Sequence, residues 1–186
     1  MRDDPTYLSY TLSMSSFKKT HWTSTLACLG PIGHLPKAPG TWGTLFAIPF
    51  SIALFQWAGI WGALAVSIAL ILFSVWCCGA AEKVLHQRDP GCVVLDEFVA
   101  VPVCYLGVAL FNPQIQMQLT ETGSLLSYQS IGLHLAVFIL FRIFDIWKPW
   151  PVGPSQKWPR GWGVVMDDIL AAGYVNLVLC LIFVLF

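Results

Sequence analysis

Residues 60–81 read IWGALAVSIALILFSVWCCGAA, an apolar run without a charged side chain. About 20 apolar residues suffice to cross the hydrocarbon core of a bilayer as a helix. The run therefore predicts a membrane-spanning helix and places the chain among integral membrane proteins.

Four more apolar segments flank this run, at about residues 44–57, 94–111, 131–147 and 164–186. Whether segment 44–57 crosses completely stays open, because it is short and only Ala58-Gly59 separates it from the central run. Of the 186 residues, 56% are hydrophobic and 11% are charged, against about 25% charged in soluble domains. We predict an all-α polytopic membrane protein, a bundle of about four to five hydrophobic helices.

Lysine and arginine predict the orientation, because cytoplasmic loops carry an excess of both. All of them lie before the first segment, after the second, or around the connection between the fourth and fifth. Five crossings with the amino terminus inside place every one on the cytoplasmic side and leave residues 112–130 as an outside loop. Residues 1–25 lack the apolar run of a cleaved signal, so we expect a polar cytoplasmic segment (1–25) before one membrane-embedded domain (26–186).

Other classes of site and partner have little support. The net charge is zero and no zinc-finger spacing or arginine-rich segment is present, so nucleic acid is not expected as a partner. The six cysteines lack CxxC spacing and are interpreted as small buried hydrophobic residues. The histidines are interpreted as structural or solvated, although His34 lies close enough to a glycine-rich motif to contact a substrate.

Charged residues gather at the cytoplasmic ends of the predicted helices. Asp96 and Glu97 begin the third segment, Asp145, Arg142 and Lys148 lie at the end of the fourth, and Asp167 and Asp168 begin the fifth. Five acids and two bases leave three uncompensated negative charges, which calls for a bound cation. Carboxylate oxygens without a Cys or His cluster favour Mg²⁺ or Mn²⁺ over Zn²⁺.

Each of these features admits two interpretations. Neighbouring helical residues point about 100° apart, so one acid of each pair is expected to face the site; alternatively, both pairs are only helix-start acids. Arg142 and Lys148, each three residues from Asp145, either clamp a phosphate or anchor the helix through an Arg142–Asp145 pair. Residues 39–44, PGTWGT, either cradle an anion or form a turn with Thr41 or Thr44 as N-cap.

Four motifs make the chain resemble the bacterial phosphatidylglycerophosphatase A family over about residues 33–173. They are PGTWGT at 39–44, VLDEF at 94–98, FRIFDIWKPWP at 141–151 and GWGVVMDD at 161–168. The resemblance implies a Mg²⁺-dependent phosphatase of the bacterial inner membrane, with its active site facing the cytoplasm, that converts phosphatidylglycerophosphate to phosphatidylglycerol. The chain departs from the family at residues 30–34, GPIGH, where the family often has a glycine-rich stretch.

With this resemblance we assign provisional roles to the polar residues. Metal ligands are Asp96, Glu97, Asp167 and Asp168; catalytic residues are Asp96, Asp145 and Asp168; substrate-binding residues are Gly40, Thr41, Arg142 and Lys148. The expected partners are the phospholipid substrate and the bilayer. Attack by water and attack by an aspartate both stay open. The main alternative is a transporter or ion channel, although an ion pathway would place ionisable groups at several depths.

Overall fold

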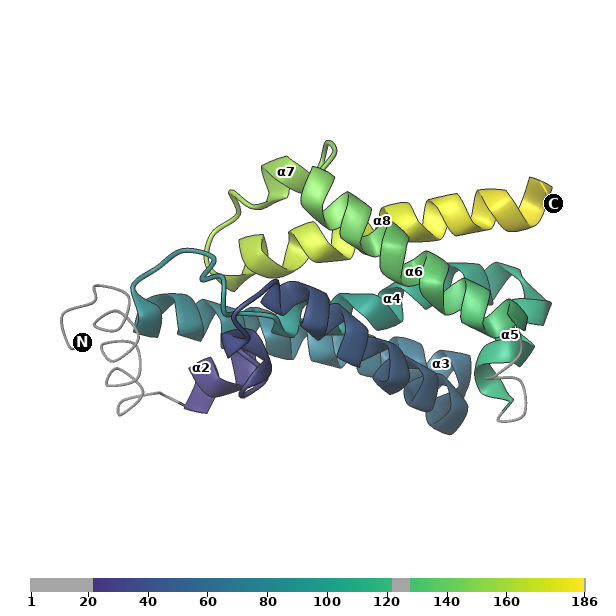
Figure 1. Cartoon of the computed structure of the whole chain (residues 1–186), viewed down its shortest axis with the longest axis horizontal. Helices are drawn as coiled ribbons and strands as arrows, with labels where there is room; N and C mark the ends of the chain where they lie inside the picture. The colour runs from purple at the N-terminus through teal and green to yellow at the C-terminus, as the bar shows by residue number, and fades with distance from the viewer. Residues whose placement is uncertain (1–21, 122–127, 186) are drawn as a thin grey trace, which may run out of the picture.

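The computed structural model describes residues 22–121 and 128–185, and all regular secondary structure in these ranges is helical (Figure 1). The elements are α2 (Trp22–Ala27), the short 3₁₀ helix η2 (Ile32–His34), α3 (Pro39–Leu85), α4 (Leu95–Phe111), α5 (Pro113–Thr120), α6 (Tyr128–Trp147), α7 (Val152–Ser155) and α8 (Gly161–Leu185). The predicted all-α class is confirmed. Most of the predicted polar segment 1–25 lies outside the described residues.

Helix α3 contains both predicted segments 44–57 and 60–81, as two arms joined at Gly59. Gly59 has φ 63° and ψ −175°, a conformation that essentially only glycine adopts, and the helix breaks there. The arms then run back beside each other, as the blue ribbons of Figure 1 show. Trp57 and Trp61 flank the turn and are 96% and 71% exposed, which suits aromatic residues at a membrane–water interface.

Helix α4 lies against both α3 and α8 and carries much of the main core. The ring of Tyr105 packs edge-on against Phe55 of α3, with centroids 6.2 Å apart. The Tyr105 hydroxyl also shares a hydrogen bond of 3.0 Å with Nδ1 of His134 in α6. The structural interpretation of His134 is therefore confirmed.

Asn176 of α8 fixes the position of α8 against α4. Its Nδ2 donates to the Val103 carbonyl at 2.7 Å, and its Oδ1 accepts from the Val108 backbone N–H at 3.3 Å. The helices come this close because Gly107 faces the amide: a Cβ there would lie 2.6 Å from Oδ1 of Asn176. A satisfied amide between apolar helices favours one relative position of the two.

The connection after α4 differs from the predicted outside loop over 112–130. Asn112 caps α5 by accepting hydrogen bonds from the backbone N–H groups of Gln114 and Ile115, at 3.0 and 3.2 Å. Ile115 and Leu119 lie four residues apart on one helical face and are buried in the main core. The loop prediction was wrong for residues 113–120, because the glutamines between Ile115 and Leu119 make the segment look polar and the apolar pair is easily overlooked.

The starts of α3, α4 and α8 and the end of α6 lie toward the same end of the bundle, near α2 and α7 (Figure 1). A second apolar cluster packs between α2, the end of α3 and the starts of α4 and α8; its buried members are Ala27, Cys77, Cys78, Ala81, Val93, Leu95, Val99, Val164 and Val165. This cluster holds the polar ends of three long helices at fixed positions.

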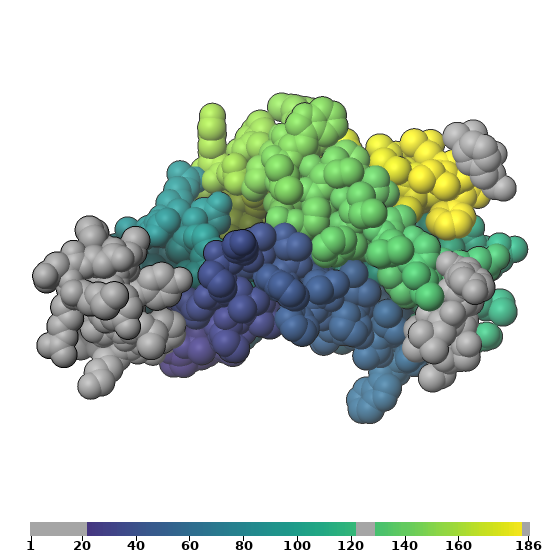
Figure 2. Space-filling model, viewed as in Figure 1, coloured from purple at the N-terminus to yellow at the C-terminus, as the bar shows by residue number. Residues whose placement is uncertain are grey.

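Among the described residues, three helices are long and apolar enough to span a membrane: α3 with its two arms, Gln129–Trp147 of α6, and Gly161–Phe183 of α8. Large apolar side chains face outward along them; Leu72, Leu135 and Leu177 are each about half exposed. Figure 2 shows α6 and the first arm of α3 meeting along one face of the molecule. The structure confirms a helical membrane protein, and the number of crossings stays a prediction.

Candidate active site

Asp96 and Glu97 lie in the first turn of α4, as predicted. The start of α4 is held by Val94, whose N–H donates to the Ala27 carbonyl of α2 at 3.0 Å. Asp96 is only 6% exposed, and nothing within the described ranges hydrogen-bonds its Oδ1. A buried carboxylate oxygen without a donor is costly, so this position favours a cation or a proton.

Residues 39–44 form the first turns of α3 and not the predicted turn before it. The chain enters the helix from Ala38, which has the left-handed conformation φ 46°, ψ 60°. Thr44 is no N-cap, since its hydroxyl donates back to the Gly40 carbonyl at 2.9 Å. Thr41 is no N-cap either: it lies inside the helix, and its N–H donates to the Ala38 carbonyl at 3.0 Å.

Gly40 and Gly43 give Glu97 room against the backbone of α3. A Cβ at Gly40 would overlap Oε1 of Glu97, and a Cβ at Gly43 would lie 3.1 Å from the Val94 side chain. The structure thus places Gly40 beside the acidic cluster, where it faces a carboxylate and not an open anion cradle. His34 is exposed in η2.

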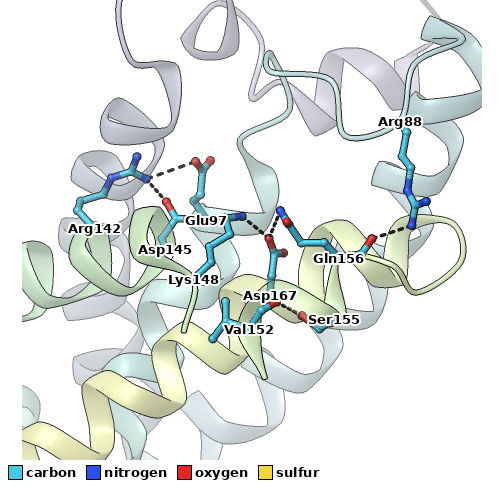
Figure 3. A network of polar contacts seen from close by, with 9 residues as sticks. All are labelled: Arg88, Glu97, Arg142, Asp145, Lys148, Val152, Ser155, Gln156 and Asp167. Carbon is cyan, nitrogen blue, oxygen red and sulfur yellow. Dashed lines mark hydrogen bonds and ion pairs between the residues drawn. The ribbon is translucent and has the colours of Figure 1, made fainter. Parts of the chain in front are cut away.

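Arg142 connects α6 to α4 across the site (Figure 3). Its Nη1 lies 2.7 Å from Oδ2 of Asp145 and 3.4 Å from Oε1 of Glu97. The predicted pair with Asp145 is present, and the same guanidinium also reaches an acid on another helix. Because 18% of its side chain is exposed, Arg142 remains accessible to an anion.

Lys148 connects the end of α6 to α8. It follows directly after Trp147, where α6 ends as predicted. Its Nζ lies 2.5 Å from Oδ2 of Asp167 and 3.8 Å from Oδ1 of Asp145. Burial lowers the pKa of Lys148, but the hydrogen bond to Asp167 and the charges of Asp167, Asp168 and Asp145 outweigh it and raise that pKa above its usual value. Lys148 therefore keeps its positive charge among the acids.

Gln156 belongs to the same network, although sequence reasoning missed it. Its side-chain Nε2 donates to Oδ2 of Asp167 at 3.0 Å, and its backbone carbonyl accepts from Nη2 of Arg88 at 2.7 Å (Figure 3). Gln156 follows α7, which is closed by the Ser155 hydroxyl donating to the Val152 carbonyl at 2.7 Å. A single glutamine in a proline-rich connection carries no sequence signal, because its role depends on how α7 packs against α8.

Asp167 and Asp168 lie in the second turn of α8, which begins at Gly161. Both residues are 3% exposed. Asp168 is close enough to be repelled by the negative charges of Asp96, Asp145, Asp167 and Glu97. The helix-start interpretation does not explain two buried acids one turn beyond the start, so both members of this pair belong to the acidic cluster.

Three buried oxygens in the cluster have no hydrogen-bond partner within the part of the chain that the structure describes: Asp96 Oδ1, Glu97 Oε2 and Asp167 Oδ1. Mg²⁺ binds such hard oxygens, usually through one or two carboxylates, and completes its shell with water and phosphate. Within the described ranges, no three His, Cys, Asp or Glu side chains are grouped to hold one ion. The donor chemistry thus fits Mg²⁺ held by one or two carboxylates, and the four-ligand site stays a prediction.

Two cysteines form a pair that their spacing of 64 residues concealed. The thiol of Cys28 donates to Sγ of Cys92 at 3.3 Å, which links the end of α2 to the loop before α4. Cys28 is buried, as the sequence interpretation has it, whereas Cys92 is partly exposed. The hydrogen bond and burial raise the pKa of Cys28, and the same bond lowers that of Cys92 to about 7.

Comparisons with known proteins agree with the resemblance. Residues 25–183 match the family described as Phosphatidylglycerophosphatase A. The chain is 32% identical over 147 residues to a Phosphatidylglycerophosphatase A of Haemophilus influenzae (78% of this chain, 79% of that protein) and 29% identical over 140 residues to one of Escherichia coli (75% and 70%). It is 34% identical over 146 residues to a Bacteroides thetaiotaomicron protein provisionally named a phosphatidylinositol-3-phosphatase (76% and 81%). No solved structure matches significantly.

Proposed function

The chain belongs to the phosphatidylglycerophosphatase A family, and from this premise we propose that it hydrolyses phosphatidylglycerophosphate to phosphatidylglycerol and inorganic phosphate with Mg²⁺. One observation carries the proposal: five carboxylates, four of them buried, lie beside Arg142 and Lys148 at one end of an apolar bundle. Phosphoryl transfer requires mainly positioning and neutralisation of charge, which such a cluster supplies.

Arg142 and Lys148 are the groups that would bind the phosphate. Each now contacts two carboxylates and keeps a partly exposed side chain, 18% for Arg142 and 27% for Lys148. A phosphate entering between them would take up donors that now serve Asp145 and Asp167. Guanidinium and ammonium groups suit phosphate oxygens because their hydrogen bonds are charge-assisted.

One or two of the carboxylates of Asp96, Glu97 and Asp167 would hold the metal ion, since each has an oxygen without a donor among the described residues. Asp168, repelled by four neighbouring acids, would gain from the same positive charge. Bound Mg²⁺ would neutralise phosphate oxygens and make a water more acidic.

Hydrolysis forms a bond from a water oxygen to phosphorus and breaks the bond from phosphorus to the glycerol oxygen, which takes up a proton. Asp145 or Asp168 would accept the proton of the attacking water. Direct attack by one of these aspartates is the alternative, and it would give an acyl phosphate that water then hydrolyses.

The polar end of the bundle would face the cytoplasm of a bacterial inner membrane. All Lys and Arg residues of the described ranges lie on α3, α6 or connections at this end: Lys37, Lys83, Arg88, Arg142, Lys148, Lys157 and Arg160. Cytoplasmic ends carry such an excess of positive charge. A site at the membrane edge would let the acyl chains of the substrate stay in the lipid.

The transporter alternative has less support. The acids cluster at the starts of α4 and α8 and the end of α6, whereas an ion pathway requires polar groups along its length. Deeper in the bundle, α4 carries buried apolar residues such as Val101, Leu106 and Val108.

The direct test adds the purified protein to phosphatidylglycerophosphate with Mg²⁺ or with a chelator and measures released phosphate. A parallel assay with phosphatidylinositol-3-phosphate examines the activity named for the Bacteroides relative. We expect phosphate release from phosphatidylglycerophosphate only with Mg²⁺. Phosphate release from the inositol lipid alone would overturn the assignment of phosphatidylglycerophosphate as the substrate. Undiminished release after chelation would overturn the proposed requirement for Mg²⁺.

Replacing single acids tests the site. Asp168→Asn should abolish turnover, whereas Glu121→Gln, a change at an exposed acid beside α5, should leave it unchanged. Both variants should insert into membranes like the parent chain. Full turnover in Asp168→Asn would remove the proposed site.

A further inference from the structure

A groove lies outside the acidic cluster, where the end of α3 meets the loop before α8. It consists of two adjoining cavities of about 500 and 590 Å³, which share Gly79, Lys83 and Arg160 as lining residues. The shared wall is tight because α3 and α8 touch there: a Cβ at Gly161 would overlap the Val75 carbonyl. The two cavities therefore form one continuous surface with two different chemistries.

The first cavity is cationic. Lys83, Arg88, Lys157 and Arg160 line it, against a single acid, Glu82, so three positive formal charges remain uncompensated. All four basic residues are exposed, and they come from two segments about 70 positions apart in the chain. A cavity of this charge is complementary to an anion.

The second cavity is aromatic and apolar. Trp22, Trp76 and Trp162 line it together with Leu72 and Val75. The rings of Trp22 and Trp76 lie with their centroids 5.3 Å apart, and all three tryptophans are 41–57% exposed. Tryptophans in this position are typical of the layer where lipid headgroups meet acyl chains.

Thr23 supplies a separate observation. This residue lines the second cavity and is 5% exposed, and its Oγ1 has no hydrogen-bond partner in the residues that the structure describes. A buried hydroxyl is normally satisfied, so this one calls for an acceptor or donor that enters the cavity.

We propose that this groove binds the headgroup of an anionic phospholipid that is not the molecule being hydrolysed. The phosphodiester lies among Lys83, Arg160 and their basic neighbours, the glycerol ester region lies beside Thr23, and the acyl chains follow the tryptophans into the membrane. A free phosphate ion would satisfy the cations but leave the aromatic wall unused. A zwitterionic lipid would bring its own cation into a cavity that already has a positive excess.

The groove is separate from the acidic cluster but connected to it. None of the five acids of the cluster lines either cavity. Arg88, which lines the cationic cavity, donates to the Gln156 carbonyl, and the Gln156 side chain donates to Asp167. A bound lipid therefore lies two residues from a predicted metal ligand without contacting it.

The test measures binding, so it does not depend on turnover. Purified full-length protein in detergent is titrated with phosphatidylglycerol or with phosphatidylcholine, and the bound lipid is counted by native mass spectrometry. The double variant Lys83→Gln/Arg160→Gln should weaken the first phosphatidylglycerol binding step by about 30-fold, the effect of two basic residues at a membrane surface. Lys37→Gln, a change at an exposed lysine before α3, is the matched control and should leave binding unchanged.

Thr23→Val keeps the side-chain shape and should weaken the same step by about fivefold, the effect of one lost neutral hydrogen bond. Both variants should still hydrolyse phosphatidylglycerophosphate, which separates a failure of this proposal from a failure of the proposed function. Equal binding of phosphatidylcholine, displacement of the lipid by millimolar inorganic phosphate, or unchanged binding in the double variant would each overturn it. So would cross-linking of a photoreactive phosphatidylglycerol only outside residues 22–24, 72–88 and 157–162.

Discussion

The ammonium of Lys148 lies 2.5 Å from Oδ2 of Asp167 and so joins the end of α6 to the second turn of α8. The two residues belong to motifs separated by α7 and its flanking prolines. Because Asp145 and Gln156 contact the same pair, Lys148 and Asp167 form the centre of the network in Figure 3.

Removing the charge of Lys148 should reduce catalysis. Lys148→Met keeps most of the length of the side chain, but it leaves Asp167 without its cation and Asp145 with Arg142 alone. We expect kcat/KM to fall at least about tenfold, which corresponds to one charged hydrogen bond. Lys37→Met, at an exposed lysine, is the control for assays of phosphate release. Equal kcat/KM for both variants would contradict a role for Lys148.

A methyl group at Gly40 should displace Glu97. Gly40→Ala places its Cβ where Oε1 of Glu97 lies, so the carboxylate must move away from Arg142. We expect a loss of about 1–3 kcal/mol in stability, typical of overpacking, together with lower activity. Gly132→Ala in α6 meets no atom within 4 Å and should behave like the parent chain in thermal unfolding and turnover. A Gly40→Ala variant with parental turnover would show that the position of Glu97 does not matter.

Asn176→Leu should destabilise the bundle without changing any acid. The variant loses the hydrogen bonds to Val103 and Val108 and brings a branched side chain toward Gly107. We expect a cost of about 1–3 kcal/mol from overpacking and a lower melting temperature in detergent. The neighbouring change Leu177→Val, at a side chain 56% exposed, should shift the melting temperature little. Similar shifts in both variants would argue against the Asn176 contact.

Cys28 and Cys92 should form a disulfide under a mild thiol oxidant such as diamide, which takes up the two hydrogens released. The pKa of Cys92, lowered to about 7, means that its thiolate fraction rises as the pH increases through 7, so cross-linking should accelerate over that range. Mass spectrometry of cysteine-containing peptides identifies the bond. Cys28→Ser should prevent it and Cys180→Ser should not. A bond that forms at the same rate at pH 6 and pH 8 would contradict the lowered pKa.

The sequence predicts the helical class, the end of α6 before Pro149 and the acids in the first turn of α4, because these follow from local rules on apolar runs, prolines and charges. It does not predict that PGTWGT is helical, since two glycines in six residues are typical of a turn. The reason for these glycines lies in another helix: a side chain at Gly40 would overlap Glu97 of α4. Gln156, Cys28 and Cys92 escape prediction for the same reason. Their partners are distant in the chain, and no spacing rule connects them.

The reversal at Gly59 determines at which end of the bundle each later helix begins. If α3 were one straight rod of 47 residues, its ends would stand about 70 Å apart, and Gly40 would be remote from Glu97. Because the chain reverses at this one residue, α3 ends on the side where it began. The acids at the start of α4, the end of α6 and the start of α8 therefore lie at that same end of the bundle. The backbone conformation of Gly59, at the opposite end of the molecule, thus determines which residues are neighbours in the acidic cluster.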